Sequence, residues 1–154
     1  MASERYKIAA VQIARVFLNR EDTVEKACRY LREVAAAGAK LVVFPEALIP
    51  GYPDWVWTLP AREPLIDELY AELLENSVEI PGQTTRRLCD EARDAGVFLV
   101  IGVNERNVEA SGASLYNTLL FIDPKGNLRK TYLKVNPEGH ERVLLNDIKA
   151  MQAS

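Results

Sequence analysis

One glutamate, Glu46, stands in a setting suited to acid–base chemistry. It comes just after the apolar residues 41–44, whose composition is typical of a short strand buried on both faces. Pro45 ends that strand because it has no N–H to donate to a neighbouring strand. Glu46 therefore falls at the carboxyl end of a strand, where open α/β sheets place their sites. The loop that follows is stiffened by two further prolines and carries three aromatic residues: Tyr52, Trp55 and Trp57. From residue types alone, Glu46 is either a general base or an ordinary surface glutamate.

A second polar stretch, residues 134–142, follows the last strand that the sequence predicts. Lys134 lies just beyond that strand and three residues before Pro137, and the pair Glu141 and Arg142 comes after it. Taken alone, these residues are a solvated lysine and a surface ion pair, and such a pair contributes little to stability. Only their combination with the first stretch gives them significance.

The two stretches together resemble the nitrilase, or carbon–nitrogen hydrolase, family. Phe-Pro-Glu-Ala at 44–47, followed by Ile-Pro-Gly-Tyr-Pro at 49–53, is similar to the family's glutamate motif, and the tryptophans nearby resemble its true-nitrilase branch. The lysine before a proline, with Glu-Arg four and five residues after that proline, is similar to the family's lysine motif. Glu138 departs from this motif, in which threonine is usual after the proline. Leu-Tyr-Asn-Thr at 115–118 also resembles the family.

This resemblance implies that Glu46, Lys134 and Glu141 are catalytic, together with a cysteine nucleophile. A nitrile or amide carbon is a poor electrophile, so it needs a thiolate and a base that generates it. By the family mechanism, Glu46 would take the thiol proton and later activate water. Lys134 would stabilise negative charge on the substrate heteroatom, and Glu141 would orient Lys134. Tyr52 and Trp57 are expected to contact the substrate, with packing of the loop as the open alternative.

The nucleophile itself is missing from the place where the family would have it. Residues 135–154 contain no cysteine, and the two cysteines of the chain, Cys28 and Cys89, fall inside helical patterns. We expect both to be small buried thiols, and we expect neither a disulfide framework nor a zinc site. The sequence therefore predicts that residues 1–142 are the N-terminal part of a carbon–nitrogen hydrolase domain. Residues 143–154 are expected to form a divergent tail, and the chain to be inactive alone.

Composition narrows the class of protein further. The chain has 154 residues, 48% of them hydrophobic and 27% charged, which is typical of a globular domain. A formal net charge of −3 gives no electrostatic argument for binding nucleic acid or an anionic membrane. The N-terminal residues lack the apolar core of a signal peptide, so we expect a cytoplasmic protein. We also expect no cofactor.

Hydrophobic periodicity predicts the elements that position these residues. Apolar runs predict strands at residues 8–13, 41–44, 97–103, 115–122 and 127–133. Helical spacing predicts a helix through residues 24–35 that is capped by Asn19 or Asp22, a second helix that starts at Pro64 with an apolar stripe, and a third at 83–95. The first strand–helix–strand unit predicts parallel strands, and the turn at 123–126 predicts a hairpin.

The fold class predicted is α/β, as the front half of a nitrilase-like α-β-β-α sandwich. Half of such a sandwich is expected to leave an apolar sheet face or strand edge uncovered. We therefore expect a homo-oligomer or pairing with a complementary half. Two functions remain open: a nitrilase-type hydrolase that acts on a small nitrile or amide, and a catalytically inactive binding or assembly module of the same fold.

Overall fold

A computed structural model gives the structure of this chain and describes residues 6–107 and 114–133. The predictions that concern Lys134, Glu141, the tail at 143–154 and most of the loop between the third and fourth strands lie outside these residues.

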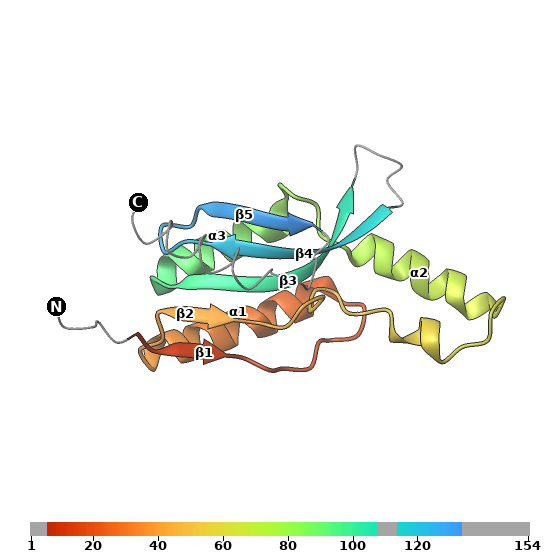
Figure 1. Cartoon of the computed structure of the whole chain (residues 1–154), viewed down its shortest axis with the longest axis horizontal. Coiled ribbons are helices and arrows are strands. Elements are labelled where there is room, and N and C mark those ends of the chain that lie inside the picture. Colours follow the sequence, from red (N-terminus) through yellow and green to blue (C-terminus); the bar gives the residue numbers. More distant parts are fainter. Residues whose placement is uncertain (1–5, 108–113, 134–154) are drawn as a thin grey trace, which may run out of the picture.

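A single five-stranded sheet forms the centre of the structure (Figure 1). The strands lie side by side in chain order: β1 (Ile8–Ala10), β2 (Leu41–Val43), β3 (Phe98–Asn107), β4 (Ser114–Ile122) and β5 (Leu128–Leu133). β1, β2 and β3 are parallel, and β4 and β5 continue the sheet in antiparallel pairing. The parallel first pair and the hairpin between β4 and β5 confirm the topology that the sequence predicts.

Strand ends differ from the prediction by more than one residue at two places. β1 ends at Ala10 instead of residue 13, although the Val11 N–H still donates to the Val43 carbonyl at 2.8 Å. β3 runs four residues past Val103, because its far end gains partners on both sides. β4 pairs with it as far as Asn107, and isolated bridges join Ile49 to Val103 and Val78 to Glu105. β3 is thus the strand on which loops from other parts of the chain are fixed.

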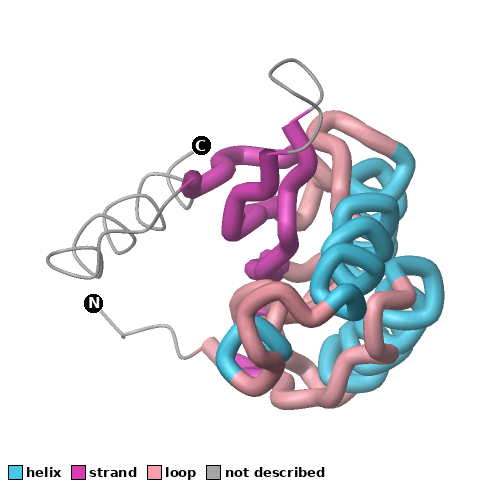
Figure 2. Tube along the Cα trace, turned by 90° about the vertical axis from the view of Figure 1, so that its right-hand side faces the viewer, coloured by secondary structure: helices cyan, strands magenta, loops and turns pink. Residues whose placement is uncertain are grey.

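Two helices, α1 (Arg20–Ala36) and α3 (Gln83–Ala95), lie together on one side of the strands (Figure 2). The side chain of Asn19 caps α1 by accepting the Asp22 N–H at 2.9 Å, which decides between the two caps that the sequence allowed. α3 has the bounds that the sequence predicts, and it ends at Gly96 with a left-handed φ of 64°.

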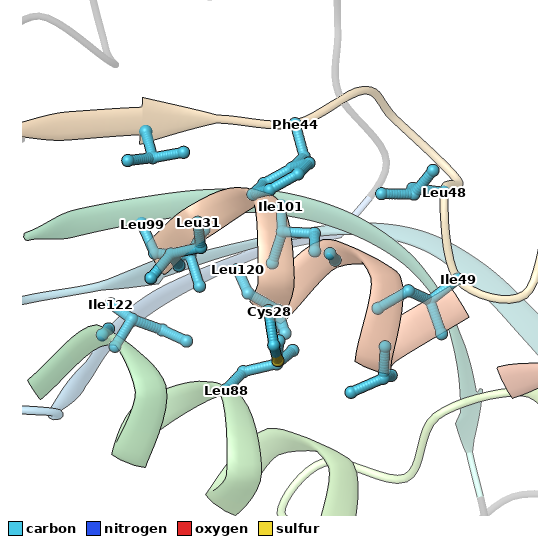
Figure 3. Packing of buried hydrophobic residues seen from close by; sticks show 14 of the residues in the cluster. Cys28, Leu31, Phe44, Leu48, Ile49, Leu88, Leu99, Ile101, Leu120 and Ile122 are labelled. Atoms are coloured by element: carbon cyan, nitrogen blue, oxygen red, sulfur yellow. The ribbon is translucent and has the colours of Figure 1, made fainter. Parts of the chain in front are cut away.

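The main core fills the space between these two helices and the sheet (Figure 3). Apolar side chains from both layers meet there, and among them are Cys28, Leu31, Leu88, Leu99, Ile101 and Leu120. Side chains alternate along β3 and β4, so Leu99, Ile101 and Leu120 face the helices. The residues that alternate with them, including Gly102 and Asn117, face the opposite side of the sheet.

The helix α2 (Pro64–Asn76) starts at Pro64 as predicted, but its apolar stripe packs less than the sequence suggests. Only Leu73 is buried, and Leu65 and Tyr70 stay 43% and 41% exposed. The reason is position: α2 extends past the end of the strands, away from the main core (Figure 1). Leu73 joins a small second cluster with Leu18 and Trp55 instead.

Within the described ranges, no helix combines the length and the apolar character that a membrane span requires. The edge strand β1 carries an exposed apolar residue, Ile8, with 62% of its surface accessible. Whether a whole sheet face is uncovered stays a prediction, because residues 134–154 lie outside the described part of the chain.

Candidate active site

The loop that carries Glu46 is fixed to the backbone of Gly102 on β3. The Gly102 N–H donates to the Pro45 carbonyl at 3.1 Å, and the Gly102 carbonyl accepts the Leu48 N–H at 3.0 Å. A Cβ atom at position 102 would collide with the backbone of Glu46 and Ala47. Only glycine therefore lets the loop cross β3 at this distance, and this close approach sets the position of Glu46.

Backbone strain is found directly beside Glu46. Ala47 is buried and has a φ of 44°, in the left-handed region that residues with a Cβ rarely adopt. Such strain persists only where the surrounding structure enforces it, and it is concentrated at functional sites. Here the two hydrogen bonds to Gly102, one on each side of Ala47, enforce it.

The far end of the same loop is held by Asn104. The buried side chain of Asn104 donates from Nδ2 to the Gly51 carbonyl at 2.6 Å, and its backbone N–H donates to the Ile49 carbonyl at 2.8 Å. Both ends of the loop are thus anchored on β3. Glu46 and Tyr52 therefore lie on a segment that has little freedom to move relative to the sheet.

A second loop, the connection between β1 and α1, reaches the site through Arg15. One guanidinium nitrogen of Arg15, Nη2, donates to Asp54 Oδ2 at 2.5 Å and to the Tyr52 carbonyl at 3.3 Å. Gly51, with a φ of 148°, leaves the space that the Arg15 side chain occupies, since a Cβ there would collide with it. Arg15 thereby joins the two loops beside Glu46.

Between the two loops lies a hollow of about 320 Å³. Its walls are mostly apolar, and the residues that line it include Ile13, Arg15, Phe17, Glu46, Leu48 and Tyr52. A volume of this size holds a small organic molecule, and a few polar groups, here Glu46 and Arg15, among apolar walls are the composition of a small-molecule site. The Glu46 carboxylate is exposed, and its Oε2 accepts a hydrogen bond of 3.4 Å from Asn117 Nδ2 on β4.

The structure separates the residues for which the sequence predicts substrate contact. Tyr52 lines the hollow together with Glu46. Trp57 does not line it, and 78% of its surface is exposed. Trp55 is only 6% exposed and packs edge-to-face against Phe17, with ring centroids 5.9 Å apart. Trp55 therefore has the packing role that was the alternative for this loop, whereas substrate contact by Tyr52 and Trp57 remains a prediction.

Lys134 and Glu141 lie outside the described residues, so their meeting with Glu46 also remains a prediction. The described chain ends at Leu133 on β5, whose register partner is Thr118 on β4. Thr118 in turn pairs with Val103, the neighbour of Gly102. The last described residue thus lies in register with the part of β3 to which the Glu46 loop is fixed.

Both cysteines lie away from this hollow. Cys28 is buried in the main core, and this burial raises the pKa of its thiol to about 11. Cys89 lies half-buried on α3, where burial likewise raises its pKa. Neither residue lines the hollow, so the chain places no thiol against Glu46. In the described ranges there is also no cluster of three His, Cys, Asp or Glu residues that could hold a metal ion.

Three polar residues of the site were not assigned to it from the sequence: Arg15, Asn104 and Asn117. Arg15 had a detectable signal, because it follows the first of two parallel strands whose carboxyl ends share one edge of the sheet. Asn117 belongs to a stretch that resembles the family motif but suggests no role by itself. Asn104 carries no signal, since a polar residue at the end of an apolar strand is ordinary.

Comparison with known proteins assigns the family. Residues 7–152 match the model of the carbon–nitrogen hydrolase family, so the chain belongs to this family. It is 38% identical over 143 residues to a nitrilase of Bacillus sp. (strain OxB-1), covering 93% of this chain and 40% of that protein. It is also 34% identical over 146 residues to an arylacetonitrilase of Aspergillus niger, covering 95% of this chain and 41% of that protein. The chain thus spans about 40% of the length of these relatives.

Solved structures support the fold. The NitFhit protein of C. elegans superposes with a TM-score of 0.62 at 20% identity, covering 88% of this chain and 29% of that chain. An amidase from Nesterenkonia sp. gives a TM-score of 0.59 at 21% identity, covering 92% of this chain and 48% of that chain. The chain therefore has the α/β fold of part of these structures, which agrees with the fold class that the sequence predicts.

Proposed function

We propose that this chain carries the base and substrate-binding part of a nitrilase, which hydrolyses a nitrile to a carboxylic acid and ammonia. In this reaction a cysteine thiolate adds to the nitrile carbon, a first water releases ammonia and leaves a thioester, and a second water releases the acid. Glu46 takes the thiol proton and later activates water. Lys134 stabilises the negative charge on the substrate nitrogen, and Glu141 holds Lys134 in place.

The observation that carries the proposal is the position of Glu46: a carboxylate on a strained, doubly anchored loop that opens into an apolar hollow. A nitrile is small and uncharged, and it matches the size and the apolar walls of this hollow. The relatives named as nitrilases point to the same class of substrate, and both aliphatic and arylaceto nitriles occur among their names.

We propose further that the thiol comes from outside these 154 residues. Cys28 lies on α1 in the main core and Cys89 lies on α3, and neither lines the hollow beside Glu46. The thiol would come from the remaining part of a nitrilase domain, on the same chain or on a partner. This also fits the share of about 40% that the chain covers in its relatives.

The test joins this chain to the part of the Bacillus sp. nitrilase that it does not match, and measures ammonia release from aliphatic and arylaceto nitriles. We expect turnover, and we expect Glu46→Gln to lower it by roughly 10²–10⁴-fold without loss of folding. Glu68→Gln on the exposed face of α2 is the matched control, with turnover unchanged. Wild-type turnover in Glu46→Gln would show that Glu46 has a structural role only.

A competing proposal follows from the same placement of the cysteines: a catalytically inactive module that associates with other members of the family. The joined protein separates the two. If it folds and assembles but releases no ammonia from any nitrile or amide, the module is the better account of this chain.

A further inference from the structure

Asn117 is a polar residue that neither the family motifs nor the proposed reaction gives a role. Its Nδ2 atom lies 3.4 Å from Glu46 Oε2, although 71 positions separate the two residues in the chain. Asn117 is exposed, so its amide does not need this contact to satisfy a buried group. The contact has to be explained from the side of Glu46.

The sheet register brings Asn117 to this position. Asn117 on β4 pairs directly with Asn104 on β3, and Gly102 pairs with Leu119. Side chains alternate along a strand, so Asn104 and Asn117 project from the sheet face on which a Gly102 side chain would lie. Glu46 crosses β3 on this face, because a Cβ at Gly102 would collide with the Glu46 backbone. The two amides thus stand side by side beneath the loop. Asn104 holds the loop backbone at Gly51, and Asn117 reaches the carboxylate.

We propose that Asn117 is a positioning residue for the catalytic base: its amide donates to one oxygen of the Glu46 carboxylate and leaves the other oxygen to take the thiol proton. This inference rests on the function proposed above for Glu46. Strain at Ala47 and the bonds of Gly102 fix the backbone, but they leave the torsions of the Glu46 side chain free. Asn117 restrains those torsions.

The residue type suits this role. An amide N–H stabilises a carboxylate by a hydrogen bond but carries no charge and does not titrate, so it does not compete for the proton that Glu46 must accept. A lysine or arginine at position 117 would hold the carboxylate as an ion pair and make it a weaker base. An apolar residue would leave the side chain without a partner on this side.

The contact is tested by the NMR signals of the asparagine side-chain amides in the 154-residue chain labelled with ¹⁵N. The pH is lowered from about 7 to about 3, which spans the range in which carboxyl groups ordinarily titrate. We expect the Asn117 Nδ2 signal to shift through one transition in the wild-type chain and to stay constant in Glu46→Gln.

The chain supplies its own controls. Asn19 Nδ2 donates to the Asp22 carboxylate at 2.9 Å, so its signal should shift with pH in both proteins. Asn76 Nδ2 donates to the Glu72 backbone carbonyl at 3.1 Å, so its signal should shift little in either. The backbone amide spectrum reports whether Glu46→Gln is folded. If it is not, Glu46→Asp keeps the charge but shortens the side chain, and it should reduce the Asn117 shift while Asn19 is unaffected.

A constant Asn117 signal in the wild-type chain, or a transition that persists in Glu46→Gln, would overturn the proposal. The measurement needs no turnover, so it is independent of the proposed function. If Glu46→Gln kept full activity in the joined protein, the role of Glu46 as base would fail while the contact with Asn117 could still stand.

Discussion

At the scale of single residues, the pair Asn117 and Glu46 makes a prediction about pH. In the joined protein, Asn117→Asp places a second carboxylate beside the first, and like charges disfavour ionisation. We expect the acid limb of the kcat/KM profile to move to higher pH. Asn117→Leu removes the hydrogen bond without adding charge, so kcat should fall roughly three- to tenfold with the acid limb moved less. Identical profiles for the two variants would contradict a direct contact.

Ala47 gives a second prediction at this scale, on stability. Its φ of 44° is costly for alanine but not for glycine, so Ala47→Gly should leave the free energy of unfolding unchanged or raise it by up to about 1 kcal/mol. Ala47→Val adds a branched side chain at a buried, left-handed position and should lower it by about 2 kcal/mol or more. Urea unfolding of the 154-residue chain measures both. A loss of about 1 kcal/mol in Ala47→Gly, as in a helix interior, would show that Ala47 is not strained.

Glu46 could be named as a candidate from the sequence because its signals are local. A short apolar strand, Pro45 and a proline-rich loop left its role open, and their resemblance to the glutamate motif of the family then indicated a base. Asn104 and Asn117 could not be found in this way. Each reaches the loop only through the register of β3 and β4, and register depends on pairing between segments that are distant in the chain. Gly102 also needs the structure, since glycine in a strand has several explanations.

At the scale of elements, the hairpin between β4 and β5 is fixed by one buried carboxylate. Asp123 accepts hydrogen bonds from the backbone N–H of Lys125 at 2.9 Å and of Asn127 at 2.8 Å, and from Arg129 Nε at 2.6 Å. Burial alone would raise the pKa of Asp123, but the hydrogen bonds from Asn127, Arg129 and Lys125 outweigh it and hold the pKa below its usual value.

This shift predicts how the stability of the chain depends on pH. A carboxyl group whose pKa is lower in the folded state stabilises the fold above its unfolded pKa of about 3.9, and this contribution is lost as the pH falls through the folded pKa. Asp123→Asn should therefore lower the free energy of unfolding by roughly 1–3 kcal/mol at neutral pH, with a smaller further loss in acid than the wild type shows. Urea unfolding at several pH values measures this. Asp67→Asn, an exposed change on α2, is the control; an equal effect of both changes would contradict the argument.

The bounds of helices and strands were predicted well where glycine or proline residues stand at both ends of a segment with clear hydrophobic periodicity. α3 has its predicted bounds because Pro81-Gly82 and Gly96 enclose a clear helical period. The apolar stripe of α2 predicted a helix correctly, but most of the stripe is not buried. Periodicity shows that one face of a helix is apolar, but it does not show where the helix lies relative to the core. α2 extends past the strands, where only Leu73 finds a core.

At the scale of the whole molecule, the order of the sheet explains why the site lies where it does. β1 and β2 are parallel, so the Arg15 loop and the Glu46 loop begin at the same edge of the sheet. Backbone hydrogen bonds to β3 fix the Glu46 loop. β4 adds Asn117 from the antiparallel side, and β5 ends in register with the same part of β3. The loop after β1 and the loop after β2 thus meet around one hollow, and β3 and β4 hold the Glu46 loop through Gly102, Asn104 and Asn117.

The same layering isolates the thiols from the site, and this can be measured. Burial raises the pKa of Cys28 to about 11, so only about one molecule in 10⁴ carries the thiolate there at pH 7. We expect Cys28 in the native 154-residue chain to react with a thiol reagent only as fast as the chain unfolds. Cys89, which is partly exposed, should react faster but more slowly than a free thiol. Rapid labelling of Cys28 in the native state would contradict the core packing.

The last prediction is that the 154-residue chain alone releases no ammonia from nitriles. Glu46 can act as a base, but the route through a thioester needs a thiolate within reach, and both cysteines lie away from the hollow with raised pKa values. Groups that act as a catalytic unit are strongly non-additive, so the loss of the nucleophile removes most of the rate that the others provide. The assay follows ammonia with aliphatic and arylaceto nitriles. Release abolished by Cys28→Ser or Cys89→Ser would show that a chain thiol is the nucleophile after all, and release that survives both changes would show direct attack by water.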